Sequence, residues 1–327
     1  MINNWMVMAV LAGLASALIF AAAGIPTFTA AAVFLLAPAP LLIVGLGSGW
    51  VVALIAGVIG ALALSLAIGW AFAVPYLLAT ALPTAIIARL ALQQRPAPAV
   101  QGGEGEARAG DVEWYPEGRV LIAIALMAGA LATGLVIMAG PDAASFRATT
   151  DQLLDRVVTI QQGGPQSPEQ KQRLESMRSL FASILPAAAA MGWTLSTFAN
   201  FRLAETVAAR LRLTARPLPR FGALAFPRTA AVGLVVASAA ALLPDSFGLI
   251  GGALAGGMSA AFAVLGLAVL HGLLDGHPFR AMLLAALYVA VVVLGFALAL
   301  PLIVTGILDM VFAMRARTRG SQSGGSV

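Results

Sequence analysis

Two short stretches hold residues whose types and spacing could do chemistry. In "HGLLDGHPFR", His271 and Asp275 stand four residues apart, on one face of a helix, and His277 follows them. Imidazole and carboxylate groups in this arrangement could bind a metal ion or relay a proton. However, Gly276 and Pro278 break the helix there, and a closed zinc site needs four ligands where this stretch supplies three. We therefore favour a polar helix end over a metal or proton site.

The second stretch, "NFRLAETVAARLR", carries Asn200, Arg202, Glu205 and Arg210. Arg202 and Glu205 are three residues apart and share a helical face. Charged side chains that reach the membrane surface explain such a pair, with a functional polar site as the alternative. Elsewhere, "GLGSG" (45–49) lacks the lysine of a phosphate loop and predicts a tight turn. No Ser/His/Asp set is evident, so we do not expect an enzyme.

A carboxylate, Asp309, stands in the apolar run "TGILDMVFAMRAR". An ionised carboxylate costs roughly 2.5–3.5 kcal/mol at the centre of a span and less near its edge, so it needs a partner. Arg315 and Arg317 follow at six and eight residues, not at the three or four that bring side chains together on a helix. We therefore predict a structural role for Asp309, with Arg280 or His271 as its partner on another helix. A proton or ligand site is the alternative.

The composition shows which kind of protein must position these residues. Hydrophobic residues make up 60% of the 327 residues and charged residues only 10%, against about a quarter in soluble domains. Long apolar runs recur along the chain, which predicts an all-α, polytopic integral membrane protein with about 8–10 transmembrane helices. The chain has no cysteine, which excludes disulfides and thiolate metal sites, and we expect no cofactor.

The apolar runs define the expected organisation of the chain. They lie at about 4–23, 28–46, 49–69, 71–92, 119–140, 179–210, 228–243, 247–272 and 281–314. Residues 1–92 then form an N-terminal four-helix membrane segment and residues 119–316 a C-terminal membrane segment. The Pro- and Gly-rich loop 93–118 and the tail 317–327 are expected to be disordered.

The arginines set the orientation. Residues 211–228 carry four arginines and no acid, which places this loop in the cytoplasm and the loop 93–118 with it. Of the 19 basic residues, 18 are arginine, and the net charge of +5 is explained by this loop pattern, so we do not expect nucleic acid as a partner. The predicted location is the bacterial inner (plasma) membrane, with both termini in the cytoplasm and the lipid bilayer as first partner.

With this orientation, residues 141–178 lie on the outer side of the membrane, opposite the cytoplasm. They are mixed in charge and helical in pattern, and "SPEQ" (167–170) is a helix start with Ser167 as N-cap. We expect two short amphipathic helices on the outer surface. They form either a lid over an external cavity or a connector packed on the surface.

The last apolar run, 281–314, is too long for one span. As a single helix it would be about 51 Å long, against a hydrocarbon core of about 30 Å. It would also place Arg315 outside. A hairpin that turns near Gly295 to Pro301 avoids both results and yields ten crossings. One long helix kinked at Pro301, with nine crossings, is the alternative.

Small residues form a stripe along the first segment. Ala9, Gly13, Ala17 and Ala21 recur at four-residue intervals, and such a stripe lets another helix approach closely. Residues 252, 256 and 260 repeat this pattern in the eighth segment. The stripe either docks a helix of another subunit or packs inside the chain.

Five stretches resemble the YybS-like family, bacterial membrane proteins known as a domain of unknown function. They are "LAPAPLLIVGLGSGW" (36–50), "EWYPEGR" (113–119), "ANFRLAETVAARL" (199–211), "GLAVLHGL" (266–273) and "GILDMVFAMRAR" (306–317). This family is distantly similar to the substrate-binding membrane subunits of energy-coupling-factor importers. In those subunits a small-residue stripe on the first helix docks the coupling subunit, and here Ala9, Gly13, Ala17 and Ala21 match that pattern. The resemblance implies another membrane subunit as partner and a small-molecule ligand.

Three functions are therefore compared. The first is a non-catalytic membrane subunit that binds a small molecule for import, and an internal polar cavity that opens outward would favour it. The second is a scaffold that organises other envelope proteins, which a solid bundle with an exposed apolar groove would favour. The third is an intramembrane enzyme, which clustered carboxylates and histidines around buried water would favour.

Overall fold

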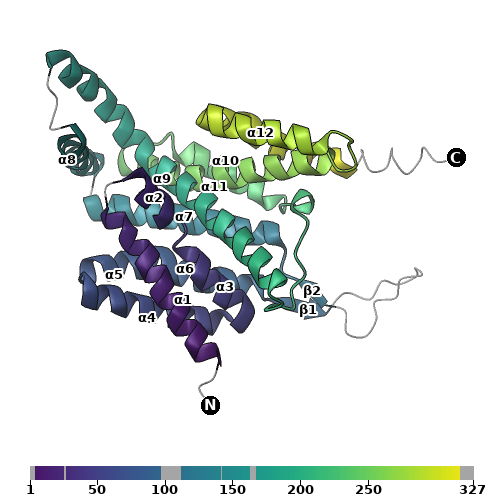
Figure 1. The fold of residues 1–327 in the computed structure, drawn as a ribbon. Helices are drawn as coiled ribbons and strands as arrows, with labels where there is room; N and C mark the ends of the chain where they lie inside the picture. The colour runs from purple at the N-terminus through teal and green to yellow at the C-terminus, as the bar shows by residue number, and fades with distance from the viewer. Residues whose placement is uncertain (1–3, 26, 97–111, 141, 163–166, 317–327) are drawn as a thin grey trace. The chain divides into compact units, whose positions relative to one another are not determined.

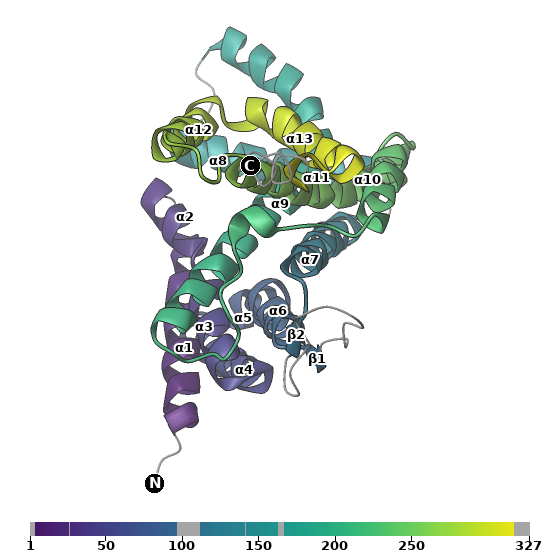
Figure 2. The ribbon, with the colours of Figure 1, turned by 90° about the vertical axis from the view of Figure 1, so that its right-hand side faces the viewer.

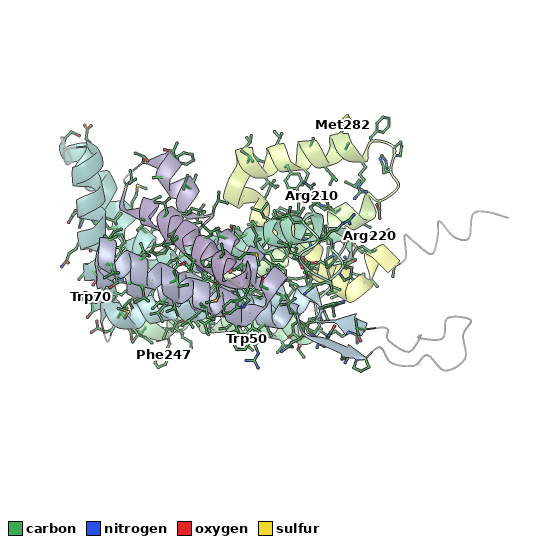
Figure 3. All side chains as sticks on the ribbon, turned by 60° about the horizontal axis from the view of Figure 1, so that its bottom comes forward. Trp50, Trp70, Arg210, Arg220, Phe247 and Met282 are labelled. Carbon is green, nitrogen blue, oxygen red and sulfur yellow. The ribbon has the colours of Figure 1, made fainter. Side chains whose placement is uncertain are left out.

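Helices form almost the whole of the chain that the structure describes (Figure 1). The structure is a computed structural model, and it describes residues 4–25, 27–96, 112–140, 142–162 and 167–316. Seven helices in these residues are long and apolar enough to cross a membrane, and three more are apolar but shorter. Large apolar side chains are exposed on them, such as Trp70 and Met282 (Figure 3). In a polytopic membrane protein such surfaces contact lipid, and the predicted fold class is confirmed.

The chain forms two units. The first contains Met1–Ile124 and Ser196–Ala225, and the second contains Ala125–Leu195 and Phe226–Val327. The first unit holds α1 (Asn4–Ala21), η1 (Ala22–Gly24), α2 (Phe28–Phe34), α3 (Pro38–Ser48), α4 (Trp50–Ala67), α5 (Trp70–Tyr76), the π-helical turn η2 (Leu77–Ala81), α6 (Leu82–Ala91), β1 (Gln94–Pro96), β2 (Val112–Trp114), η3 (Phe221–Ala223), the start of α7 (Glu117–Ala139) and the end of α9 (Pro168–Arg210). The second unit holds the remainder of α7 and α9, with α8 (Ala143–Gln162), α10 (Thr229–Ala240), α11 (Asp245–Leu273), α12 (Arg280–Leu294), η4 (Gly295–Leu298) and α13 (Ala299–Phe312).

The small-residue stripe of α1 is covered by α4 of the same chain. Ala9 and Ala17 are almost completely buried, and a Cβ on Gly13 would collide with the carbonyl oxygen of Ala56. Ala21, at the end of the stripe, is partly buried against the same core. The close approach that the spacing predicts is therefore present, but its partner is internal. Of the two alternatives for the stripe, the structure supports packing inside the chain, because α4 already covers the surface at Gly13.

The second predicted segment is two helices, α2 and α3, rather than one. Pro38 has no N–H to donate to the carbonyl of Phe34, and Ala37 donates to that carbonyl instead. The break leaves other carbonyls without helical partners, and side chains supply donors. The Ser16 hydroxyl donates to Ala37 O at 2.6 Å, and the Asn200 amide donates to Leu35 O at 2.7 Å. These two backbone acceptors are thereby satisfied, as an apolar surrounding requires.

Helix α11 is the buried centre of the second unit, and its glycines allow close packing. A Cβ on Gly256, Gly257 or Gly266 would collide with a backbone carbonyl of α9, α7 or α13, respectively. Gly252, which the sequence grouped with Gly256, faces open space instead. Ala260 is fully buried.

The last apolar run is broken, as the length argument predicts. Helix α12 ends at Leu294, Gly295 has φ +49°, and α13 begins at Ala299. Figure 2 shows the two helices pointing in different directions. They have 15 and 14 residues, or about 22 and 21 Å of helix. Each is therefore shorter than the hydrocarbon core of about 30 Å.

The region predicted to be external contains α8 and the beginning of α9. Helix α9 begins at Pro168, directly after Ser167, as the capping pattern predicts. It then continues to Arg210 as one helix of 43 residues. The expected second short helix is therefore wrong, because it is the first part of this longer helix.

Short strands border the loop that was predicted to be disordered. β1 and β2 pair antiparallel, with Gln94 opposite Trp114 and Pro96 opposite Val112. The centre of the loop, 97–111, and the tail, 317–327, lie outside the described residues. The prediction of a tight turn over residues 45–49 is wrong for most of this stretch, because α3 continues through Ser48 and only Gly49, with φ +101°, separates it from α4.

Candidate functional site

An apolar pocket of about 280 Å³ lies within the second unit, between α7, α8 and α9. This volume is close to the lower end of the range of about 300–1,000 Å³ for ligand sites. Its lining residues are almost all apolar: Ala132, Leu135, Met138 and Ala139 from α7, Phe146, Thr149 and Thr150 from α8, and Leu185, Pro186 and Ala189 from α9. No charged side chain belongs to this lining among the described residues. We refer to it below as the α8 pocket.

The corner between α7 and α8 positions α8 along this pocket. Gly140 has φ +150°, a conformation that a residue with a Cβ rarely adopts. Asp142 then caps α8, because its carboxylate accepts hydrogen bonds from the Ser145 N–H at 2.8 Å and the Ser145 hydroxyl at 2.7 Å. These bonds lower the pKa of Asp142. Farther along, Arg178 of α9 forms an ion pair with Asp155 of α8.

The two hydroxyl groups that line the α8 pocket are already engaged. Thr150 donates to Phe146 O at 2.9 Å, and Thr149 donates to Ala139 O at 3.4 Å. Their methyl groups, with the Phe146 ring, complete an apolar wall. An apolar wall of this kind is suited to contact with an apolar molecule.

Sequence reasoning missed the residues of this pocket. A signal was present, because Phe146, Thr149 and Thr150 recur at i, i+3 and i+4 and therefore share one face of an amphipathic helix. On α9, Leu185, Pro186 and Ala189 stand at i, i+1 and i+4. Spacing alone could not show that the two faces, on helices separated by a loop, border the same space.

A second cluster of polar residues is buried in the first unit, where it forms a network of ion pairs. Arg202 Nη1 lies 2.7 Å from Glu117 Oε1 and 2.9 Å from Glu205 Oε2. Arg216 Nε lies 3.5 Å from Glu205 Oε1. The carboxylate and Arg216 side chains are at most 5% exposed, and Arg202 is 20% exposed. Two cations thus balance two carboxylates away from water.

The ion-pair network fixes loops to helix ends. Arg216, in the loop after α9, donates to the carbonyl oxygens of Ala91 and Tyr115. Arg202 donates to Pro219 O at 3.1 Å. Burial is the main cause that lowers the pKa of Arg216, yet a guanidinium remains charged at neutral pH. Because every charge is paired, the network is best suited to hold structure.

The sequence showed only part of this network. The pair of Arg202 and Glu205 was predicted to share a face, and it does. The explanation by snorkelling is wrong, because the pair is directed to Glu117 and Arg216 rather than to the membrane surface. Glu117 is 85 residues from Arg202, and no local spacing could reveal this contact.

Asp309 pairs with Arg315, and the predicted partners Arg280 and His271 are both wrong. Arg315 donates to Asp309 Oδ2 through Nη2 at 2.7 Å and Nε at 3.0 Å, and its N–H donates to Oδ1 at 3.1 Å. Helix α13 ends at Phe312, and Ala313 is left-handed with φ 50° and ψ 46°. This residue turns the chain back, so the six-residue spacing no longer follows helical geometry. The predicted structural role is consistent with the pair.

The residues of the HGLLDGHPFR stretch have other partners. His271 Nε2 lies 3.2 Å from the Tyr288 hydroxyl, and His271 Nδ1 lies 2.9 Å from Leu267 O. Asp275 accepts from Arg280 at 2.8 Å. In the part of the chain that the structure describes, no three His, Cys, Asp or Glu side chains are grouped for a metal ion.

Comparison with known proteins identifies the family of the chain. No curated protein matched the sequence, and no solved structure matched it. The family described as "Predicted membrane protein (DUF2232)" matches residues 13–310, which is nearly the whole chain and agrees with its apolar helices. The chain therefore belongs to this family of predicted membrane proteins.

Proposed function

We propose that the protein is a non-catalytic membrane subunit that binds a small apolar molecule in the α8 pocket for import. The observation that carries this proposal is the pocket itself: a space of about 280 Å³ with an apolar lining and one amphipathic helix, α8, on its side. The cavity expected for import was polar, whereas this one is apolar, so the ligand that we propose is an apolar molecule. The absence of acids and bases from the described lining favours binding over catalysis.

The proposed orientation places this pocket on the outer side of a bacterial inner membrane. The pocket lies at the C-terminal end of α7, whereas the N-terminal end of this helix carries Arg119 and follows the loop 93–118. The positive-inside rule assigns that loop, with the arginine-rich residues 211–228, to the cytoplasm. A span of 23 residues is about 34 Å long, so the other end of α7 reaches the outer face. A ligand would then enter from outside, beside α8.

The resemblance to the YybS-like family, and through it to the substrate-binding subunits of energy-coupling-factor importers, supports the same function. In the proposal a second membrane subunit couples binding to transport. The surface that receives this subunit is not the small-residue stripe that the resemblance implies, because α4 covers Gly13 and its neighbours.

Purification of the full chain in mild detergent, followed by solvent extraction and mass spectrometry, tests the proposal. The result expected is one apolar small molecule in near-stoichiometric amount, together with a co-purifying membrane subunit. Adding this molecule back to stripped protein should raise the melting temperature, because a ligand that binds only the folded state stabilises it. Preparations that contain only detergent and bulk lipid, with several envelope proteins attached, would contradict the proposal and favour the scaffold.

A further inference from the structure

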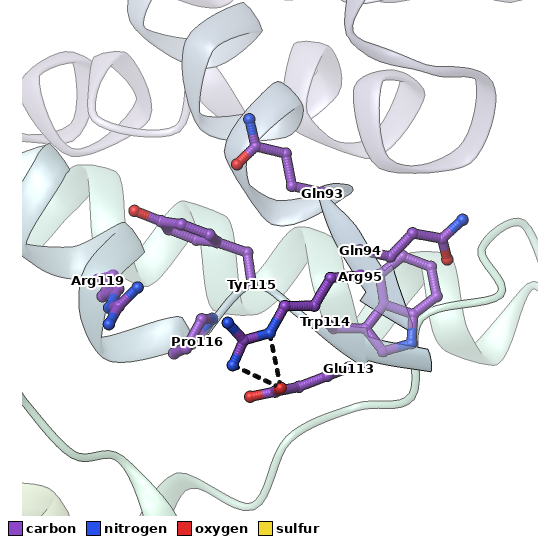
Figure 4. Close-up of a pocket in the computed structure, with 8 residues that line it drawn as sticks. All are labelled: Gln93, Gln94, Arg95, Glu113, Trp114, Tyr115, Pro116 and Arg119. Carbon is purple, nitrogen blue, oxygen red and sulfur yellow. Dashed lines mark hydrogen bonds and ion pairs between the residues drawn. The ribbon is translucent and has the colours of Figure 1, made fainter. Parts of the chain in front are cut away.

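A second concave surface lies in the first unit, where the β1–β2 hairpin meets the first turn of α7. It has a volume of about 380 Å³ and is more polar than the α8 pocket. Figure 4 shows the residues that line it: Gln93, Gln94, Arg95, Glu113, Trp114, Tyr115, Pro116 and Arg119. We refer to it as the hairpin groove. Neither the buried ion-pair network nor the proposed import function involves these side chains.

The charges of the hairpin groove leave one cation in excess. Arg95 and Glu113 form an ion pair of 2.8 Å, with side chains 71% and 42% exposed. Arg119 is exposed and forms no ion pair with the described residues of the chain. An exposed pair contributes little to stability, so Arg95 can exchange Glu113 for a stronger anion at small cost. Two guanidinium groups in one groove are suited to a phosphate, which accepts their forked hydrogen bonds.

The other lining residues add donors and an apolar side. Gln93 and Gln94 carry amide groups, and Trp114 and Tyr115 add aromatic rings to the lining (Figure 4). Tryptophan and tyrosine are enriched at the level of lipid headgroups. A groove lined by both cations and aromatic rings, at the start of an apolar helix, matches a ligand that combines a phosphate with an apolar portion.

We propose that the hairpin groove binds a phosphate group, held by Arg119 and Arg95. The phosphate belongs either to an anionic lipid headgroup or to a free phosphate ion. This site goes beyond the proposed import function and does not depend on it, because the groove and the α8 pocket share no residue.

Calorimetric titration of the full chain in a non-ionic detergent tests the proposal, with two probes: short-chain phosphatidylglycerol and inorganic phosphate. Binding of the lipid alone identifies a headgroup site, and binding of both probes identifies a site for the phosphate group itself. Either result supports the proposal if it depends on Arg119. Saturable binding of neither probe overturns it.

Three variants give the test its specificity. Arg119→Gln should weaken binding about tenfold or more, as the loss of a charge-assisted hydrogen bond predicts. Glu113→Gln should strengthen binding, because it releases Arg95. Arg220→Gln removes an exposed arginine outside the groove and should change the affinity less than about twofold. Equal weakening by Arg119→Gln and Arg220→Gln would show non-specific attraction to a basic surface and would overturn the proposal. Melting temperatures confirm that each variant is folded.

Discussion

Replacing Arg202 by glutamine should strongly destabilise the protein, because this cation serves two buried carboxylates. It contacts Glu117 at 2.7 Å and Glu205 at 2.9 Å. Glutamine leaves Glu117 without a counter-ion and Glu205 with Arg216 alone, at 3.5 Å. Removing one partner of a buried ion pair costs about 3–5 kcal/mol. The loss of the bond to Pro219 O adds to this cost, so the free energy of unfolding should fall by at least about 3 kcal/mol.

A double-mutant cycle with Glu117→Gln separates the charge effect from general damage. The double variant removes one cation and one carboxylate, and it leaves the Glu205–Arg216 pair neutral. We expect Glu117→Gln to recover part of the loss caused by Arg202→Gln, with a coupling energy of about 1.5–3 kcal/mol. Reversible unfolding in mixed micelles of mild detergent and dodecyl sulfate would measure all four proteins. Additive effects of the two substitutions would refute the network as a coupled unit.

Three further predictions concern the packing, the end of α13 and the topology. Gly13→Leu should lower stability by about 1–3 kcal/mol or prevent folding, because a side chain there meets Ala56 O. The control Gly134→Leu should keep the melting temperature of the wild type, since that glycine faces open space. Equal melting temperatures of the two variants would contradict the α1–α4 contact. Asp309→Asn should lower the free energy of unfolding by about 1–3 kcal/mol, because its bonds to Arg315 are weakened. Asp275→Asn, in an exposed pair, should lower it by less than about 1 kcal/mol. A larger loss for Asp275→Asn than for Asp309→Asn would refute the role assigned to the α13 pair. A membrane-impermeant thiol reagent should label Gly164→Cys in intact cells and reach Gly103→Cys only after permeabilisation, and the opposite pattern would overturn the proposed orientation.

Hydrophobic pattern and helix-breaking residues allowed much of the fold to be predicted. Apolar length predicted the candidate spans, and the argument from length predicted the break after Leu294. The turn at Gly49 and the start of α9 at Pro168 followed from local residue types. These features depend on short-range geometry, which a single sequence contains. The break between α2 and α3 was missed, although Pro38 was a visible signal for it.

Features that depend on long-range contacts or on one unusual dihedral angle could not be predicted. The left-handed conformation of Ala313 brings Arg315 to Asp309, and alanine carries no signal for it. Glu117 and Arg216 reach the ion-pair network only through the fold. The stripe of α1 was recognised as a close-packing surface, but the identity of its partner helix is tertiary information. The α8 pocket was missed for the same reason.

The most direct test of the central claim compares the bound small molecule in two variants of the α8 pocket region. Ala189 lines the pocket, so Ala189→Phe would fill it. Ala144 is an exposed alanine on α8 outside the lining, so Ala144→Phe makes the same change without occupying the space. Mass spectrometry should measure a near-stoichiometric apolar molecule in the wild type and in Ala144→Phe, and little in Ala189→Phe. Equal amounts in all three proteins, or none in the wild type, would contradict the proposal that the α8 pocket is a ligand site.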